Sequence, residues 1–211
     1  MSALDEFSIE VEGDEGLFKD SDFPTATGLK QAAVLIPLVR VNNEWHILFI
    51  VRATNPKDRH SGQVAFPGGR QDASDTSIEH TALRETEEEI GVSAEHIQVL
   101  TTLTPYVTIS DYAVTPVVAI VQWPQTLKLQ TDEVERTLTL PVAWLSDRKN
   151  LSLRARKEMD EQSAQRHPVV VYEEQQGCVL WGATARMTLN CLKACMDGEF
   201  STAPPLDITN L

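Results

Sequence analysis

The sequence predicts an α+β fold in which a mixed β-sheet is covered by helices on both faces. Two observations support this: short apolar runs typical of strands dominate the chain, and only the segments 76–90 and 183–197 have the length and pattern of convincing helices. The chain has 211 residues and is 42% hydrophobic, so it can bury one sizeable core without a disulfide or metal staple. We therefore expect one domain at 29–200, between an acidic, weakly ordered N-terminal arm at 1–28 and a tail at 201–211.

Turn residues separate the predicted strands. Asn42-Asn43 joins the first two strands as a hairpin, and Gln175-Gln176-Gly177 joins the last two. The segment 131–145 combines a turn, a strand and a short helix, and the polar stretch 150–167 is expected to be a long insertion loop. The predicted strands are 32–41, 44–53, 63–66, 96–109, 112–121, 169–174 and 178–182.

The helix at 76–90 follows the turn Pro67-Gly68-Gly69. Thr76 and Glu79 are placed for a capping box at its start, and Gly91 is a stop signal at its end. No internal repeat is present.

Three glutamates lie on one face of this helix, because Glu85, Glu88 and Glu89 occupy positions i, i+3 and i+4. Each like-charge pair costs a solvated helix roughly 0.2–0.5 kcal/mol. A bound hard divalent cation would turn this cost into a stabilisation, since Mg²⁺ and Mn²⁺ prefer oxygen ligands. The alternative is an ordinary exposed acidic face. Arg84 one turn before Glu88, and the glycine turn ahead of the helix, favour the metal.

The composition excludes several classes of protein. A formal net charge of -13 is the wrong sign for a broad surface that binds a nucleic-acid backbone, so we expect no nucleic-acid partner. No run reaches the roughly 18 apolar residues of a membrane helix, and the acidic start is unlike a signal peptide, so we expect no membrane partner and a cytoplasmic location. Cys178, Cys191 and Cys195 have no CxxC spacing, so we expect reduced, buried or half-buried side chains.

The glutamate face lies in a segment that resembles the Nudix box, G-x5-E-x7-R-E-U-x-E-E-x-G-U, where U is a bulky apolar residue. Its second half is matched from Arg84 to Val92, with Thr86 where an apolar residue is usual. The first half departs from the pattern. A strict match requires Gly and Glu where Arg70 and Thr76 stand; counting from Gly69 makes Asp75 the acidic residue, with one extra residue before Arg84.

The coenzyme A diphosphatase branch of the Nudix family is similar in further stretches. It carries GG-x2-D-x2-D before a TALRE-like segment, and upstream it carries approximately LLTxRS followed by R-x3-G-x3-FPGG. The arginine of the second signature is out of place here, because Asp58 stands four residues before Gly62 and Arg59 follows it. The matching residues are Gly68, Gly69, Asp72, Asp75, 81–85, Arg52, Gly62 and 66–69, and VLWGATA at 179–185 is similar to an IWGxTA segment near the end of that branch.

The resemblance implies a Nudix-type α/β/α sandwich that hydrolyses a nucleoside diphosphate linked to another moiety, by attack of water on phosphorus with Mg²⁺ or Mn²⁺. It makes Glu85 and Glu89 the principal metal ligands, with Glu88 sharing a metal or held by Arg84. The backbone carbonyl of Gly69 is a further ligand.

Catalytic and substrate-binding residues are also implied. The general base is Glu85 or Glu133, since the family often has a glutamate before Val at the latter point; an idle, exposed Glu133 is the alternative. Asp75 is expected to orient the start of the helix. The residues that we expect to contact substrate are Arg52, Arg59, His60 and the backbone of Gly68, and Trp181 either stacks on adenine or belongs to the core.

The leading hypothesis is a coenzyme A diphosphatase that releases 3′,5′-ADP and 4′-phosphopantetheine from a coenzyme A-like substrate. A second hypothesis keeps the machinery and changes the substrate to ADP-ribose, a dinucleotide, an oxidised nucleotide or a capped RNA end, since loops outside the box set specificity. A third hypothesis is a domain that binds a nucleotide as a sensor and does not hydrolyse it. The glutamate face argues against this, because a non-catalytic domain has no need for carboxylates that repel one another. Members of the family often form homodimers, and this sequence leaves that open.

Overall fold

A mixed β-sheet lies at the centre of the computed structural model, which describes residues 7–10, 28–54, 61–108, 110–156 and 168–196. Within these residues its strands are β2 (Lys30–Val41), β3 (Glu44–Arg52), β4 (Val64–Ala65), β5 (Gly68–Arg70), β6 (Ile97–Thr102), β7 (Tyr106–Val107), β8 (Tyr112–Val121) and β9 (Val134–Pro141). The main strand order is β4-β3-β2-β8-β6, with β5 beside β2, β7 beside β8 and β9 beside β3. Strands β2 and β8 are parallel, and the other described pairs are antiparallel.

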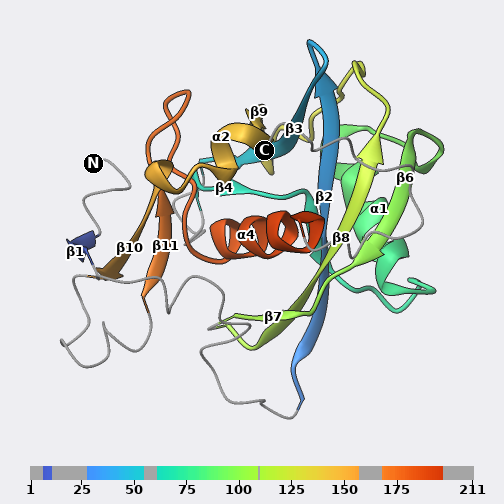
Figure 1. Ribbon diagram of the computed structural model, residues 1–211. Helices are drawn as coiled ribbons and strands as arrows, with labels where there is room; N and C mark the ends of the chain where they lie inside the picture. Colours follow the sequence, from blue (N-terminus) through green and yellow to red (C-terminus); the bar gives the residue numbers. More distant parts are fainter. Residues whose placement is uncertain (1–6, 11–27, 55–60, 109, 157–167, 197–211) are drawn as a thin grey trace.

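Helices cover both faces of this sheet, as Figure 1 shows: α1 (Ile78–Ile90) lies on one side, and α4 (Gly182–Met196) lies on the other. Alternation along β2 explains the two layers. Leu35 packs in one hydrophobic cluster with Ala82 of α1, whereas Ile36 packs in the other with Leu189 of α4. The short helix α2 (Val142–Ser146) joins the α4 side. The predicted α+β sandwich with a mixed sheet is therefore confirmed.

The first predicted hairpin is confirmed. Asn42 and Asn43 have φ values of 50° and 68°, the left-handed conformations that a tight turn between β2 and β3 requires. In the second hairpin the pairing is reduced to two isolated antiparallel bridges, Val171 with Trp181 and Gln175 with Cys178. The segment 131–145 forms the predicted turn, strand and short helix.

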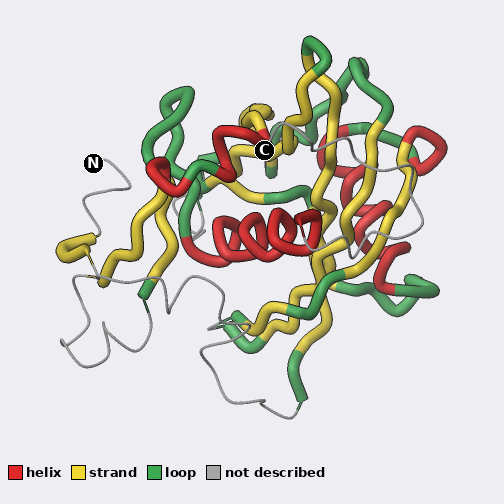
Figure 2. The backbone as a smooth tube through the Cα atoms, viewed as in Figure 1, coloured by secondary structure: helices red, strands yellow, loops and turns green. Residues whose placement is uncertain are grey.

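A second, three-stranded sheet has the order β1-β10-β11 and lies on the α4 side of the molecule (Figure 2). Its strands are β1 (Phe7–Glu10), β10 (Leu151–Arg156) and β11 (Val169–Tyr172), and the 3-10 turns are Ala94–His96 and Arg148–Asn150. The predicted loop at 150–167 is therefore wrong for β10, whose Leu151 and Leu153 are buried in the core. The rest of that loop and the C-terminal tail lie outside the described residues. So does the N-terminal arm apart from β1 and residue 28.

The ends of α1 correct one prediction and confirm another. The helix starts at Ile78, and its N-cap is Ser77, whose hydroxyl accepts the His80 N–H at 3.1 Å. The predicted capping box on Thr76 is therefore wrong, because the Thr76 N–H donates instead to Nδ1 of His80. Gly91 does end the helix, with φ 74° and its N–H donating to the Glu87 carbonyl.

Two further expectations concern the cysteines and membrane-spanning helices. All three cysteines are free, with Cys191 buried and Cys178 and Cys195 half-buried. No helix in the described part of the chain is long and apolar enough to cross a membrane.

Candidate active site

Helix α1 places the three glutamates of the predicted face, Glu85, Glu88 and Glu89, in very different environments. The Glu89 residue is only 2% exposed, the Glu85 side chain is 16% exposed, and the Glu88 side chain is 59% exposed. Burying an ionised carboxylate without a partner is costly. Glu89 and Glu85 are therefore the two carboxylates whose position needs a compensating partner.

Strand β5 lies directly against these two carboxylates. The Gly68 N–H donates to Oε2 of Glu89 at 2.9 Å. At Gly69, a Cβ would stand 2.5 Å from the carboxyl carbon of Glu85, so any larger residue here would push that carboxylate out of its present position. The main chain of Gly68 and Gly69, here called the backbone wall, therefore lies directly beside the two carboxylates.

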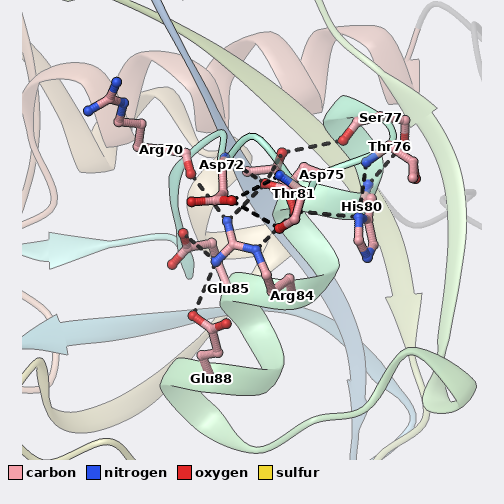
Figure 3. Close-up of polar contacts among 11 residues, drawn as sticks. Arg70, Asp72, Asp75, Thr76, Ser77, His80, Thr81, Arg84, Glu85 and Glu88 are labelled. Atoms are coloured by element: carbon pink, nitrogen blue, oxygen red, sulfur yellow. Dashed lines mark hydrogen bonds and ion pairs between the residues drawn. The ribbon is translucent and has the colours of Figure 1, made fainter.

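Arg84 links the helix to the turn that precedes it (Figure 3). Its Nε and Nη2 donate to the two oxygens of Asp75, each at 2.9 Å, and its Nη2 also donates to the Arg70 carbonyl at 3.2 Å. Its Nη1 lies 2.9 Å from Oε1 of Glu85 and 3.1 Å from Oε2 of Glu88. A planar guanidinium suits this two-sided arrangement, because its donors lie in a fixed fork.

The Asp75 carboxylate is closed off from solvent and fully engaged. Besides Arg84 it accepts hydrogen bonds from the Thr81 hydroxyl at 3.0 Å and the Asp72 N–H at 2.8 Å. The Arg84 hydrogen bonds hold the pKa of Asp75 well below its usual range. The extra residue in the first half of the box is accommodated in the turn from Asp72, whose carbonyl accepts the Asp75 N–H at 3.1 Å.

The buried carboxylates hold their protons more tightly than free ones. Burial raises the pKa of Glu89 to about 7, against the hydrogen bond from Gly68. Burial also raises the pKa of Glu85, which Arg84 partly opposes. The negative charge of Glu133 raises both pKa values further. That of Glu88 adds to the rise at Glu85, that of Glu85 adds to the rise at Glu89, and Arg52 lowers the pKa of Glu89. Glu133 and Arg52 therefore act electrostatically on the same site.

The structure brings most of the predicted residues together. Arg52 ends β3, and exposed Glu133 immediately precedes β9, where the Ala53 N–H donates to the Glu133 carbonyl at 2.8 Å. Half-buried Trp181 packs with Val171, which agrees with the core alternative. Arg59 and His60 lie outside the described residues.

The donor set fits a hard divalent cation. The glutamates and the carbonyl groups of β5 offer oxygens only, and the absence of a side chain at Gly69 lets the Glu85 carboxylate lie directly against this backbone. Across the described ranges, no group of three or more Asp, Glu, His or Cys side chains is arranged so that it could hold a metal ion by itself. Mg²⁺ commonly takes one or two carboxylates and fills its other positions with water and substrate phosphate, so an open set is what it requires.

Sequence reasoning missed two contributors. Thr81 supports Asp75 through its hydroxyl, and only its helical position, one turn before Glu85, hints at this. The segment before Glu133 also packs on the end of α1, where Gln130 and Lys128 donate through backbone N–H groups. A backbone contact leaves no side-chain signal, although alternating Leu127 and Leu129 mark its buried side.

Comparison with known proteins decides the family, since residues 29–162 match the NUDIX domain. The chain belongs to the Nudix family. It is a Nudix hydrolase, and hydrolases of this family generally act on small nucleotide derivatives with divalent metal ions such as Mg²⁺ or Mn²⁺.

Two relatives are informative. An uncharacterised Nudix hydrolase, NudL, from Pectobacterium atrosepticum is 37% identical over 157 residues, which cover 74% of this chain and 78% of that protein. The human mitochondrial coenzyme A diphosphatase NUDT8 is 39% identical over 121 residues, covering 56% of this chain and 51% of NUDT8. The chain therefore spans only about half the length of the human relative.

Among solved structures, a MutT/nudix family protein from Enterococcus faecalis superimposes with a TM-score of 0.53 at 17% identity. The match covers 83% of this Nudix hydrolase and 65% of that chain. At this identity the similarity shows the fold alone.

Proposed function

We propose that this Nudix hydrolase cleaves the diphosphate bond of coenzyme A or its derivatives, giving 3′,5′-ADP and 4′-phosphopantetheine. The observation that carries the proposal is the backbone wall of Gly68 and Gly69 against the carboxylates of Glu89 and Glu85. That wall belongs to FPGG, a stretch in which the chain resembles the coenzyme A diphosphatase branch. The name of the human relative supports the same substrate.

Glu85, Glu89 and the Gly69 carbonyl would hold Mg²⁺ or Mn²⁺. When bound, the cation neutralises the diphosphate and lowers the pKa of a coordinated water. Glu88 stays with Arg84, which is fixed by Asp75 and keeps Glu85 in place.

The remaining residues act on water and substrate. Exposed Glu133 accepts the proton of the attacking water, whose oxygen forms the new bond to phosphorus while the bridging P–O bond breaks. Arg52 binds a phosphate of the substrate, as a guanidinium can do through two parallel hydrogen bonds. Arg59 and His60 remain predicted contacts from the segment between β3 and β4. The cytoplasmic location and the homodimer also stay predictions.

A substrate panel tests the proposal. The protein is incubated with Mn²⁺ and coenzyme A, ADP-ribose, a dinucleotide or an oxidised nucleoside triphosphate, with Glu89→Gln as the inactive control. The expected result is the highest kcat/KM on coenzyme A. Faster turnover of ADP-ribose would reassign the substrate within the family, and nucleotide binding without any turnover would point to a sensor.

A further inference from the structure

The last turn of α1 is attached to a segment that comes nearly forty residues later in the chain. Residues 127–134 are here called the strap. In space they extend from the C-terminal end of α1 to the first residue of β9. The Lys128 N–H donates to the Ile90 carbonyl at 3.0 Å, and the Gln130 N–H donates to the Glu89 carbonyl at 2.9 Å. These carbonyls belong to the orphan acceptors at a helix C-terminus, so the strap caps the helix that carries the carboxylates.

The other end of the strap is attached to β3. The Gln130 carbonyl accepts the N–H groups of Glu133 at 2.9 Å and Val134 at 2.7 Å, which closes a tight turn. The Glu133 carbonyl accepts the Ala53 N–H at 2.8 Å, next to the pairing of Val134 with Arg52. The main chain of Glu133 is therefore held from two sides, by α1 through Gln130 and by β3 through Ala53.

Gly91 is what lets the strap approach. A Cβ at this position would lie 2.8 Å from Cβ, 3.0 Å from N and 3.1 Å from O of Lys128. Two of these three atoms are backbone, so they cannot be moved by changing a rotamer. The half-buried side chains of Leu127 and Leu129 pack against the hydrophobic cluster that includes Ile90 of α1. Moving the strap away from α1 would expose these side chains to water.

We propose that Gly91 and the strap form a positioning device, which fixes the Glu133 carboxylate relative to those of Glu85 and Glu89. Gly91 thus has a second task besides ending the helix. In support, the Glu133 charge acts on both Glu85 and Glu89 although it is far from them in sequence. The inference rests on Nudix hydrolysis and on the proposed part of Glu133, and it does not depend on coenzyme A as the substrate.

Gly91→Asn separates the clash from backbone strain. Asn tolerates a positive φ better than other residues with a side chain, but it adds the Cβ that meets Lys128. The matched control is Gly177→Asn, because Gly177 has φ 73° and no atom within 4 Å of an added Cβ. Amide hydrogen exchange is measured first, on the protein without metal. Gly91→Asn is expected to speed exchange at Lys128 and Gln130 by about tenfold or more, and Gly177→Asn to leave it unchanged.

A double-mutant cycle then connects the strap to catalysis. The panel substrate that the wild type hydrolyses fastest is used, so failure of coenzyme A as a substrate leaves this test intact. Gly91→Asn is expected to lower kcat about tenfold and Glu133→Gln about 100-fold. Because both act through one carboxylate, the double variant should be no slower than Glu133→Gln alone. Independent effects multiplying to about 1000-fold, wild-type kcat in Glu133→Gln, or unchanged amide exchange in Gly91→Asn would each overturn the inference.

Discussion

Replacing Glu89 by Gln should stabilise the metal-free protein while it destroys the active site. Burial raises the pKa of Glu89 from its ordinary value of 4.5 to about 7. One pKa unit corresponds to about 1.36 kcal/mol, so the ionised carboxylate lowers the free energy of unfolding by about 3 kcal/mol above pH 7. Gln keeps an oxygen that can accept the Gly68 N–H and carries no charge.

The pH range of this effect follows from the direction of the pKa change. Below the unfolded-state value of 4.5 the carboxyl is neutral in both states, and the penalty is absent. Between 4.5 and about 7 the folded state binds the extra proton, so the stability of the wild type falls as pH rises. From about pH 5 to about pH 8 the wild type should lose about 2.5 kcal/mol relative to Glu89→Gln.

The assay is urea unfolding of both proteins in EDTA at these two pH values. Glu87→Gln is the matched control, because Glu87 is exposed on the same helix and should show no such change. Comparing the difference at two pH values removes any constant cost of the new amide. With Mn²⁺ at about 100 times its Kd, the wild type alone should gain about 2.7 kcal/mol. A difference that is the same at both pH values would refute the reasoning.

The remaining predictions concern the surroundings of the carboxylates. Gly69→Ala places a methyl group where the Glu85 carboxylate lies, so Mn²⁺ affinity should fall about tenfold or more; isothermal calorimetry measures this, and unchanged affinity would contradict the backbone wall. In Asp75→Asn the loss of stability should be largest above the ordinary pKa of 3.8. It should shrink steadily as pH falls from 3.8 toward the much lower folded-state pKa, because the stabilisation depends on the ionised carboxylate held by Arg84; urea unfolding across acidic pH shows whether the loss stays constant there instead. Thr86→Val should leave kcat unchanged and alter the free energy of unfolding by no more than about 1 kcal/mol, because it removes one hydrogen bond, from the buried hydroxyl to the Ala82 carbonyl at 2.7 Å; a larger loss in urea unfolding would show that the hydroxyl supports the fold.

Local signals predicted the parts of the fold that depend on neighbouring residues. The apolar run at 112–121 is β8 from end to end, and Gly91 ends α1 as expected. At the helix start two adjacent residues carry hydroxyl groups, and Ser77, whose backbone is extended, is the N-cap. The spacing from Thr76 to Glu79 favoured Thr76, whereas the structure uses Ser77 and the His80 N–H.

Contacts between residues far apart in the sequence could not be predicted in the same way. In LSLRAR the alternation of Leu151 and Leu153 is present, but β10 pairs with β11, which begins only at Val169, and with β1, which lies near the start of the chain. In the site, helical spacing predicted the three-glutamate face. It could not rank the burial of Glu85, Glu88 and Glu89, because this depends on where β5 lies.

Because α1 and α4 cover opposite faces of the central sheet, the choice of boundaries matters when a shorter fragment of this protein is expressed. The region that matches the NUDIX domain ends at residue 162, before β11 and α4 begin. A fragment confined to 29–162 would lose the whole apolar cover that α4 supplies, including Leu189 and Cys191, and would strip both neighbours from β10. Open strand edges and a bare hydrophobic face invite self-association, so such a fragment should aggregate when expressed.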